Sequence, residues 1–362
     1  MITLSAEAMS VLTRSYRYHV AVESWLGGEL LADSIPIETG DEDTDRTLRV
    51  PERVTFTVPR LDRGVSWSPV TDRHPLAANG QRLRVLLGVG LDGLRVEWFQ
   101  RGWFLITESR TEGDTVTVTA AGLLALIDEA RLVSPFQPTG DLSSTLRALV
   151  EPALTVVIDP AVTILDRTVP AGANYDEDRL GAVLEVLDAW PADASVSADG
   201  YLHVVSATPP ATPVLALSDG AGGTLVRSSG ASTREGAATA VVARGTAPDG
   251  GQVQGVAYDT SGGPKSYFGP FNPLPVPAFF SSPLLSTAGQ AQAAADTVLA
   301  RLRQATAREF EVEMVPHPAL QVGDVVSITN RDVTDLPCTV ETLRLPYTAG
   351  GGAQTLTVRA LP

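Results

Sequence analysis

The sequence contains a single cysteine, few aromatic residues and no long hydrophobic run. Cys338 alone excludes an internal disulfide and any zinc site built from several cysteines. No stretch reaches the roughly 18 consecutive apolar residues that a membrane-spanning helix needs, and the N-terminus lacks the basic and apolar regions of a signal peptide. We therefore expect a protein that is made in a cytoplasm and does not insert into a membrane.

Basic residues are also scarce relative to acidic ones. The 27 Lys and Arg residues against 42 Asp and Glu give a formal net charge of -15, which opposes adhesion to DNA, RNA or anionic lipid. Solubility would explain this charge, and so would a surface past which DNA must slide. With 44% hydrophobic and 19% charged residues, the 362-residue chain is globular and long enough for two or three domains.

Alternation of apolar and polar residues dominates the first part of the chain. It predicts strands at 16–25, 29–37, 53–58 and 83–118, with a long loop at 59–80, a helix at 120–132, and a short helix or an extended arm at 1–15. Gly88, Gly90 and Gly93 match a dinucleotide fingerprint as a string. That motif requires a helix to follow, whereas residues 94–107 alternate as a strand, so the glycines and Asp92-Gly93 indicate hairpin turns.

The middle of the chain has a mixed pattern. Residues 141–206 predict an α+β module with helices beginning at Asp141 and Asp176 and a hairpin that turns at Asp199-Gly200. Strand patterns resume at 212, and residues 261–283 form a long loop rich in Pro, Gly and aromatics.

A helix and a strand near the C-terminus give the strongest local pattern. Thr287 and Gln290 have capping-box spacing, and an alanine-rich apolar face behind them predicts a helix at 287–305. The next segment alternates Phe310, Val312 and Met314 with Glu309, Glu311 and Glu313, which is typical of a half-buried strand.

No motif points to catalysis or to a cofactor. His19, His74, His203 and His317 are scattered, and none has metal-ligand spacing. The acidic run from Asp41 to Asp45 lacks the glycine of a calcium loop, so we expect a solvated acidic loop at 38–45. We assign no catalytic, cofactor-binding or metal-binding residue, predict no cofactor, and expect that the chain is not an enzyme.

Two segments carry a resemblance to a known family. The predicted helix that leads into EVEMVPHPALQVGDVVSI, and the segment RGWFLITESRTEGDTVTVTAAGLLALID, are similar to the tail hub or baseplate hub proteins of tailed phages and related contractile injection devices. The resemblance implies a mainly β fold with α+β insertions, in which two tube-type β-barrel domains carry a small α+β module. We therefore expect a first barrel at 1–135, the α+β module at 136–210, and a second barrel at 211–362.

The same resemblance implies a structural role in the virion. A homotrimeric ring would join the tail tube to the tip or baseplate and surround the DNA channel. Its partners would be the tail tube or distal tail protein, the tape measure protein and tip or fibre proteins, and DNA would pass through during ejection without specific binding. The sequence ends soon after the strand predicted at 355–360, so we expect no lytic domain.

Three readings of function stay open at this point. The acidic residues Glu309, Glu311 and Glu313, or the 38–45 loop, would line the channel of a hub. Exposed aromatics in the 261–283 loop would favour a carbohydrate- or receptor-binding baseplate protein instead. An enzyme would need a single carboxylate on which activity depends. The host and the type of tail are not encoded in any pattern of this sequence.

Overall fold

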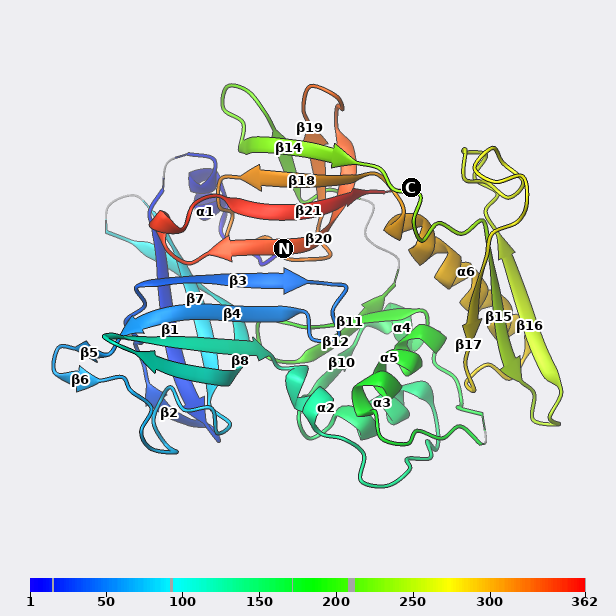
Figure 1. The fold of residues 1–362 in the computed structure, drawn as a ribbon, viewed down its shortest axis with the longest axis horizontal. Coiled ribbons are helices and arrows are strands. Elements are labelled where there is room, and N and C mark those ends of the chain that lie inside the picture. Colours follow the sequence, from blue (N-terminus) through cyan, green and yellow to red (C-terminus); the bar gives the residue numbers. More distant parts are fainter. Residues whose placement is uncertain (15, 92–93, 171, 208–211, 362) are drawn as a thin grey trace.

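The structure is a computed structural model that describes residues 1–14, 16–91, 94–170, 172–207 and 212–361. It confirms the predicted mainly β fold, with large antiparallel sheets and a few helices (Figure 1). Within these ranges, no helix has the length and apolar character needed to cross a bilayer. The Asp92-Gly93 turn falls outside the described residues.

A thirteen-stranded sheet forms the body of the molecule. Eleven of its strand pairs are antiparallel, including β19 (Val325–Thr329) with β20, and β13 (Leu215–Ser218) pairs in parallel with β19. The path of neighbouring strands is β14 (Leu225–Ala231), β18 (Glu309–Met314), β21 (Gln354–Ala360), β20 (Leu336–Pro346), β3 (Thr39–Asp45), β4 (Glu52–Pro59), β9 (Thr115–Gly122), β8 (Val96–Glu112), β7 (Arg82–Gly90), β1 (Tyr18–Leu26) and β2 (Glu29–Ala32).

The N-terminal and C-terminal halves of this sheet meet along β3 and β20. These strands pair antiparallel from Thr342 opposite Asp45 to Pro346 opposite Asp41. The core is also shared, because Phe56 of β4 belongs to the same buried cluster as Phe310 of β18 and Val340 of β20. The two expected barrels are thus halves of one continuous sheet with one core.

The acidic segment at 38–45 is a strand rather than the predicted loop. Its alternate residues Glu42 and Thr44 point into the core, while Asp43 is exposed. Because the inward positions are polar, the segment lacks the apolar alternation by which strands are recognised in a sequence. Smaller differences occur in the predicted 59–80 loop, which contains a hairpin of β5 (Leu61–Asp62) and β6 (Val65–Ser66).

The α+β module packs beneath the N-terminal half. Its sheet has the order β10 (Val156–Ile158), β12 (Leu202–Ser206), β11 (Ala192–Val196), with the last two forming the predicted hairpin. Asp141 caps the first helix as predicted, whereas the second begins after Asp178 and not at Asp176. The helices are α2 (Ala125–Glu129), α3 (Leu142–Val150), α4 (Pro160–Thr163) and α5 (Arg179–Ala189). The helix predicted at 120–132 is shortened to α2 because β9 continues to Gly122.

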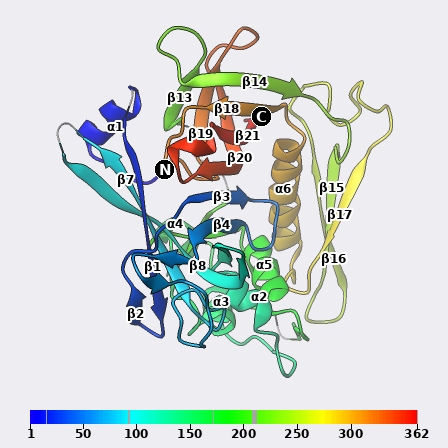
Figure 2. The same ribbon diagram turned by 60° about the vertical axis from the view of Figure 1, so that its left-hand side comes forward.

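Part of the expected second barrel forms a separate unit. The strands β15 (Ala240–Thr246), β16 (Gln252–Tyr258) and β17 (Pro277–Ser281) make a three-stranded sheet, so β17 lies within the predicted 261–283 loop. Helix α6 (Ala288–Ala305) covers one face of this sheet, as Figure 2 shows.

The packing of α6 explains this separation. A Cβ at Gly255 of β16 would lie 2.3 Å from the backbone nitrogen of Gln292, so only glycine lets the helix approach so closely. The buried Ala291, Ala294 and Ala295 supply the matching small face of the helix. The predicted capping box of Thr287 and Gln290 is present at its start. The sequence identified the helix correctly but not the sheet that it covers.

The remaining described elements are short. Helix α1 (Ala6–Leu12) packs against Val89 at the end of β7, which resolves the helix-or-arm alternative for this segment in favour of a helix. A 3-10 turn, η1 (Ala349–Gly351), connects β20 to β21. The described part of the Gly88-x-Gly90 string lies within β7, as expected of a strand and not of a nucleotide-binding turn.

A buried ion pair within the N-terminal half, Arg101 with Glu42, also forms hydrogen bonds with residues of the C-terminal half. The strand β8 bulges opposite β7 at Arg101, which turns this side chain inward. Its guanidinium donates to both carboxylate oxygens of Glu42 at 2.7–3.0 Å and to the Leu320 carbonyl at 2.6 Å. The two side chains are 3% and 5% exposed. Tyr347 donates to Glu42 as well, at 3.2 Å.

We predict that Arg101→Met lowers the free energy of unfolding by about 3–5 kcal/mol, because it leaves the Glu42 carboxylate buried without its cation. Denaturant unfolding measures this loss. The control is Arg110→Met, which removes an arginine paired with Glu112 where both side chains are more than two-thirds exposed, at 69% and 68%. That change should cost no more than about 0.5 kcal/mol. Equal effects of the two substitutions would contradict the role of the buried pair.

Candidate assembly face

One face of the continuous sheet is polar over eight neighbouring strands. The registers place alternate side chains of β14, β18, β21, β20, β3, β4, β9 and residues 107–112 of β8 on this side, which we call the polar sheet face. Figure 1 looks onto it, with β14 at the top and β8 at the bottom. Threonine is its commonest residue, at Thr39, Thr55, Thr57, Thr115, Thr117, Thr119, Thr342, Thr355 and Thr357.

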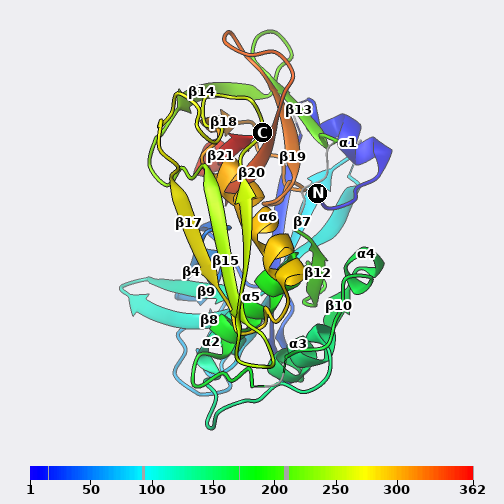
Figure 3. The same ribbon diagram turned by 90° about the vertical axis from the view of Figure 1, so that its right-hand side faces the viewer.

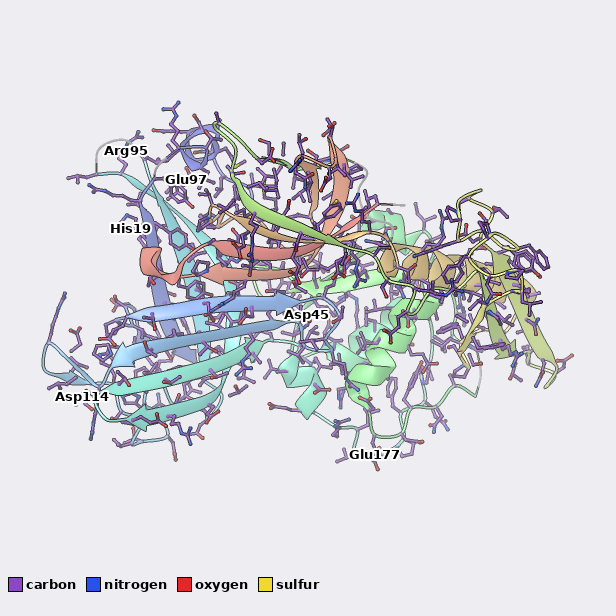
Figure 4. The ribbon with its side chains drawn as sticks, turned by 45° about the horizontal axis from the view of Figure 1, so that its top comes forward. His19, Asp45, Arg95, Glu97, Asp114 and Glu177 are labelled. Atoms are coloured by element: carbon purple, nitrogen blue, oxygen red, sulfur yellow. The ribbon has the colours of Figure 1, made fainter. Side chains whose placement is uncertain are left out.

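Carboxylates outnumber guanidinium groups on the polar sheet face. Eight carboxylates and five guanidinium groups give a balance of three negative charges, and none of the described positions on this face is aromatic. The acids are Asp41, Asp43, Asp45, Glu108, Glu112, Glu309, Glu311 and Glu313. The bases are Arg53, Arg110, Arg227, Arg344 and Arg359. Figure 4 labels Asp45 at the end of β3.

Most of these charges are paired across strands. Arg344 contacts Asp41 at 2.7 Å and Asp43 at 3.8 Å, which holds the two halves together on the outer side of the β3–β20 junction. The pKa of Asp43 is raised, mainly by desolvation and then by the neighbouring Asp41. Arg359 pairs with Glu309 at 2.9 Å, and Arg227 pairs with Glu313 at 2.8 Å. Among the described residues, Glu311 has only the Ser229 hydroxyl as a side-chain partner, at 3.3 Å.

The two sides of this eight-strand region end in strand edges. Within the described ranges, strand β14 pairs with β18 alone. At the other side, β7 pairs with β8 only as far as Leu105, so residues 108–112 pair with β9 alone among the described residues. Unpaired edges of this kind are templates for another chain, and β-proteins cover them or close them into rings.

The structure brings together the acidic residues that the sequence singled out as two alternatives. Glu309, Glu311 and Glu313 share one face with Asp41 and Asp43 because β18 and β3 belong to the same sheet. Sequence analysis did not identify the arginines that form ion pairs with these acids, because cross-strand partners that are far apart in the sequence leave no local pattern. Arg101 was missed for the same reason; its bulge is set by the register with β7.

A partly open cavity of about 250 Å³, which we call the chamber, lies behind the junction, where the two halves meet the α+β module. Glu42, Glu52 and Arg101 line it from the first half, Asp324 from the second, and His203 from the module. The Oε2 atom of Glu52 is buried without a hydrogen-bond partner among the described residues. Glu52 as a whole is only partly buried. Burial, and to a lesser extent Glu42, raise the pKa of Glu52 from 4.5 to about 7.

The described residues offer little for metal or nucleophilic chemistry. No group of three or more His, Cys, Asp or Glu within the described ranges could hold a metal ion. Cys338 is buried, and burial raises the pKa of its thiol to about 12. Burial likewise lowers the pKa of His317 to about 4. The other histidines lie far apart, with His19 beside Trp98 and His203 at the chamber.

Aromatic residues of the 261–283 segment mostly contact one another or arginines. Tyr267 packs against both Tyr258 and Phe268, with ring centroids 4.3 Å apart in each pair. Arg234 lies over Phe271 at 4.0 Å and Arg244 over Phe279 at 5.0 Å. Phe268 and Phe279 are exposed, and neither lines any of the five clefts described for this structure.

Comparison with known proteins identifies the fold. No protein-family model and no curated protein matches the sequence. A tail protein from Neisseria meningitidis matches with a TM-score of 0.65 at 14% identity, covering 94% of this chain and 96% of that one. The prophage MuSo2 43 kDa tail protein from Shewanella oneidensis matches with a TM-score of 0.62 at 10% identity, and the match covers 94% of this chain and 98% of that one.

A third tail protein has the same arrangement. The prophage tail protein gp18 from Listeria monocytogenes matches with a TM-score of 0.57 at 11% identity, covering 94% of each chain. All three likenesses extend over nearly the full length of both chains. This chain therefore has the fold of phage tail proteins, which confirms at the level of fold the resemblance noted in the sequence.

We predict that Glu52→Gln removes a pH dependence of stability. A carboxyl whose pKa is raised on folding contributes stability below its unfolded pKa of 4.5, and this contribution is lost as the pH rises through about 7. The loss amounts to at most about 3 kcal/mol, from about 1.4 kcal/mol per pKa unit. Thermal unfolding between pH 5 and 8 should show a smaller decline for Glu52→Gln than for the native chain. Equal declines would contradict the assignment, and the exposed Glu177→Gln is the control.

Proposed function

We propose that the chain is a structural tail hub or tip protein that forms a homotrimeric ring around the DNA channel. One observation carries this proposal: an eight-strand polar face, net negative and without aromatics, ends on both sides in strand edges. The full-length likeness to phage tail proteins supports the virion as the setting.

The two edges suggest how copies join. Strand β14 lies at one side of the face and residues 108–112 of β8 lie at the other, so the free edge of one copy can pair with the opposite edge of the next. Such a contact is head-to-tail, and head-to-tail contacts form rings when the rotation closes. Closure would satisfy every exposed edge of the face and place the face on the inside.

The charge of the face suits a DNA channel. A phosphate backbone is repelled by net negative charge. Three of the five arginines on the face, Arg227, Arg344 and Arg359, are held by carboxylates at 2.7–2.9 Å. Threonine hydroxyls offer a hydrated surface without the aromatic rings on which bases stack. DNA would pass without being held, so no cofactor or catalytic group is required of this protein.

The partners follow from such a position in the virion. A ring of this kind would contact the tail tube or distal tail protein on one side, and the tip or fibre proteins on the other. The tape measure protein would end at its channel. The α+β module and the α6 unit project from the same end of the polar sheet face, as Figure 3 shows from that side, and this end offers the larger surface for such contacts.

We predict that Glu311→Lys slows DNA ejection several-fold at low ionic strength while the mass of the assembled ring is unchanged. Glu311 forms no ion pair with an arginine in the described part of the chain, so charge reversal adds two positive units per copy without breaking a described ion pair. Attraction between exposed charges is screened within about 10 Å at 0.1 M salt, so the delay should shrink as salt is added. Ejection is timed from virions that carry the variant.

The matched control is Glu177→Lys, which makes the same charge change far from the polar sheet face (Figure 4). It should leave ejection at the native rate. Unchanged ejection by Glu311→Lys at low salt, or an equal delay in both variants, would count against a channel lined by this face.

A further inference from the structure

A second cleft lies outside the polar sheet face. It occupies about 670 Å³ between the N-terminal half of the sheet and the α+β module. Its lining includes Trp25, Arg82, Trp103, Tyr201 and the loop at 152–155. Clefts of this size between two packed units are where small ligands commonly bind.

The floor of the cleft is aromatic. Trp25 of β1 and Trp103 of β8 point to the same side of the sheet across β7, with ring centroids 6.1 Å apart and an edge-on angle of 64°. Gly200 has a positive φ of 86°. A Cβ at this position would lie 3.0 Å from Trp103, so this turn of the module packs closely against the indole ring. Tyr201, next to that turn, is 44% exposed and adds a phenol at the rim.

The guanidinium of Arg82 lines the same cleft and has no ion-pair partner among the described residues. Arg82 lies opposite Trp25 in the register of β1 and β7 and is half-buried. It has no ion pair or side-chain hydrogen bond with any described residue, whereas its neighbour Arg84 is held by Gln100 at 2.8 Å and Glu23 at 3.4 Å. In a chain with a net charge of -15, an arginine left free in a cleft favours an anionic ligand.

The cleft also contains an acceptor for hydroxyl groups. Asp199 lines the cleft, and its Oδ1 atom accepts the backbone N–H of Tyr201 at 3.1 Å and the Ser197 hydroxyl. Its Oδ2 atom lies 3.7 Å from His203 Nε2 and has no closer partner among the described residues. Its carboxylate can accept further hydrogen bonds but repels an anion, so the ligand should present its charge to Arg82 and its hydroxyls to Asp199. A ring that carries both a carboxylate and hydroxyls, with an apolar face for the indoles, has this pattern.

We propose that this cleft binds an acidic sugar, such as a uronic acid residue of a surface polysaccharide. An acidic peptide is the competing ligand, but extended peptides bind by adding to a free strand edge. Here β1 and β7 are each paired on both sides, and the remaining walls are turns and a loop. The cleft therefore supplies side-chain contacts and stacking rather than a backbone ladder.

The test uses the full chain and two methyl glycosides of equal shape, methyl glucuronide and the neutral methyl glucoside, with binding followed by isothermal titration and tryptophan fluorescence. The glucuronide should bind saturably and more tightly than the glucoside. Arg82→Gln should weaken glucuronide binding roughly tenfold to a hundredfold and leave glucoside binding unchanged, since it removes a charged hydrogen bond. Tyr201→Ser should weaken both sugars several-fold through lost stacking.

The matched control is Arg110→Gln, an exposed arginine on the polar sheet face, which should bind both sugars as the native chain does. No saturable binding of the glucuronide at tens of millimolar would overturn the proposal. Equal binding of the two sugars would overturn the role of Arg82. Tighter, Arg82-dependent binding of a short acidic peptide would overturn the sugar assignment. None of these outcomes depends on ring formation.

Discussion

The buried pair of Arg101 and Glu42 is the contact on which the arrangement of the molecule depends. It joins β8 to β3 inside the core and extends to the Leu320 carbonyl and Tyr347 of the C-terminal half. A charge pair with so little exposure is costly to form and more costly to break. Its directional bonds fix one alignment of the two halves, whereas apolar packing alone would accept several.

That alignment is what makes the outer face continuous. With β3 set against β20, the outward residues of both halves fall on one surface, and Arg344 reinforces the junction from the outside by contacting Asp41 and Asp43. The same pairing leaves free edges only at the far sides of the face. An acidic surface that ends in two unpaired edges is consistent with the proposed ring around a polyanion, which needs no pocket or catalytic group.

The sequence was informative where structure is local and silent where it is not. The capping box at Thr287, the cap at Asp141 and the alternation around Phe310 are set by neighbours in the chain, and these predictions were confirmed. The strand at 39–45 was missed because its inward residues are Glu42 and Thr44, which are buried only by virtue of Arg101 and the core around it. The sequence did not indicate that β15 and β16, within the expected second barrel at 211–362, form a separate sheet, because this depends on the close approach of α6 at Gly255. Contacts between segments that are distant in the chain produce no periodic pattern of residues by which a sequence could predict them.

The most direct test of the central claim is an image reconstruction, by electron cryo-microscopy, of the assembled particle formed by the purified chain or isolated with its tail. We expect a three-fold ring in which residues 225–231 of one copy lie beside residues 107–112 of the next, and Glu311 and Asp43 face the channel. A ring with the polar sheet face turned outward, or a two-fold dimer that buries this face, would contradict the account.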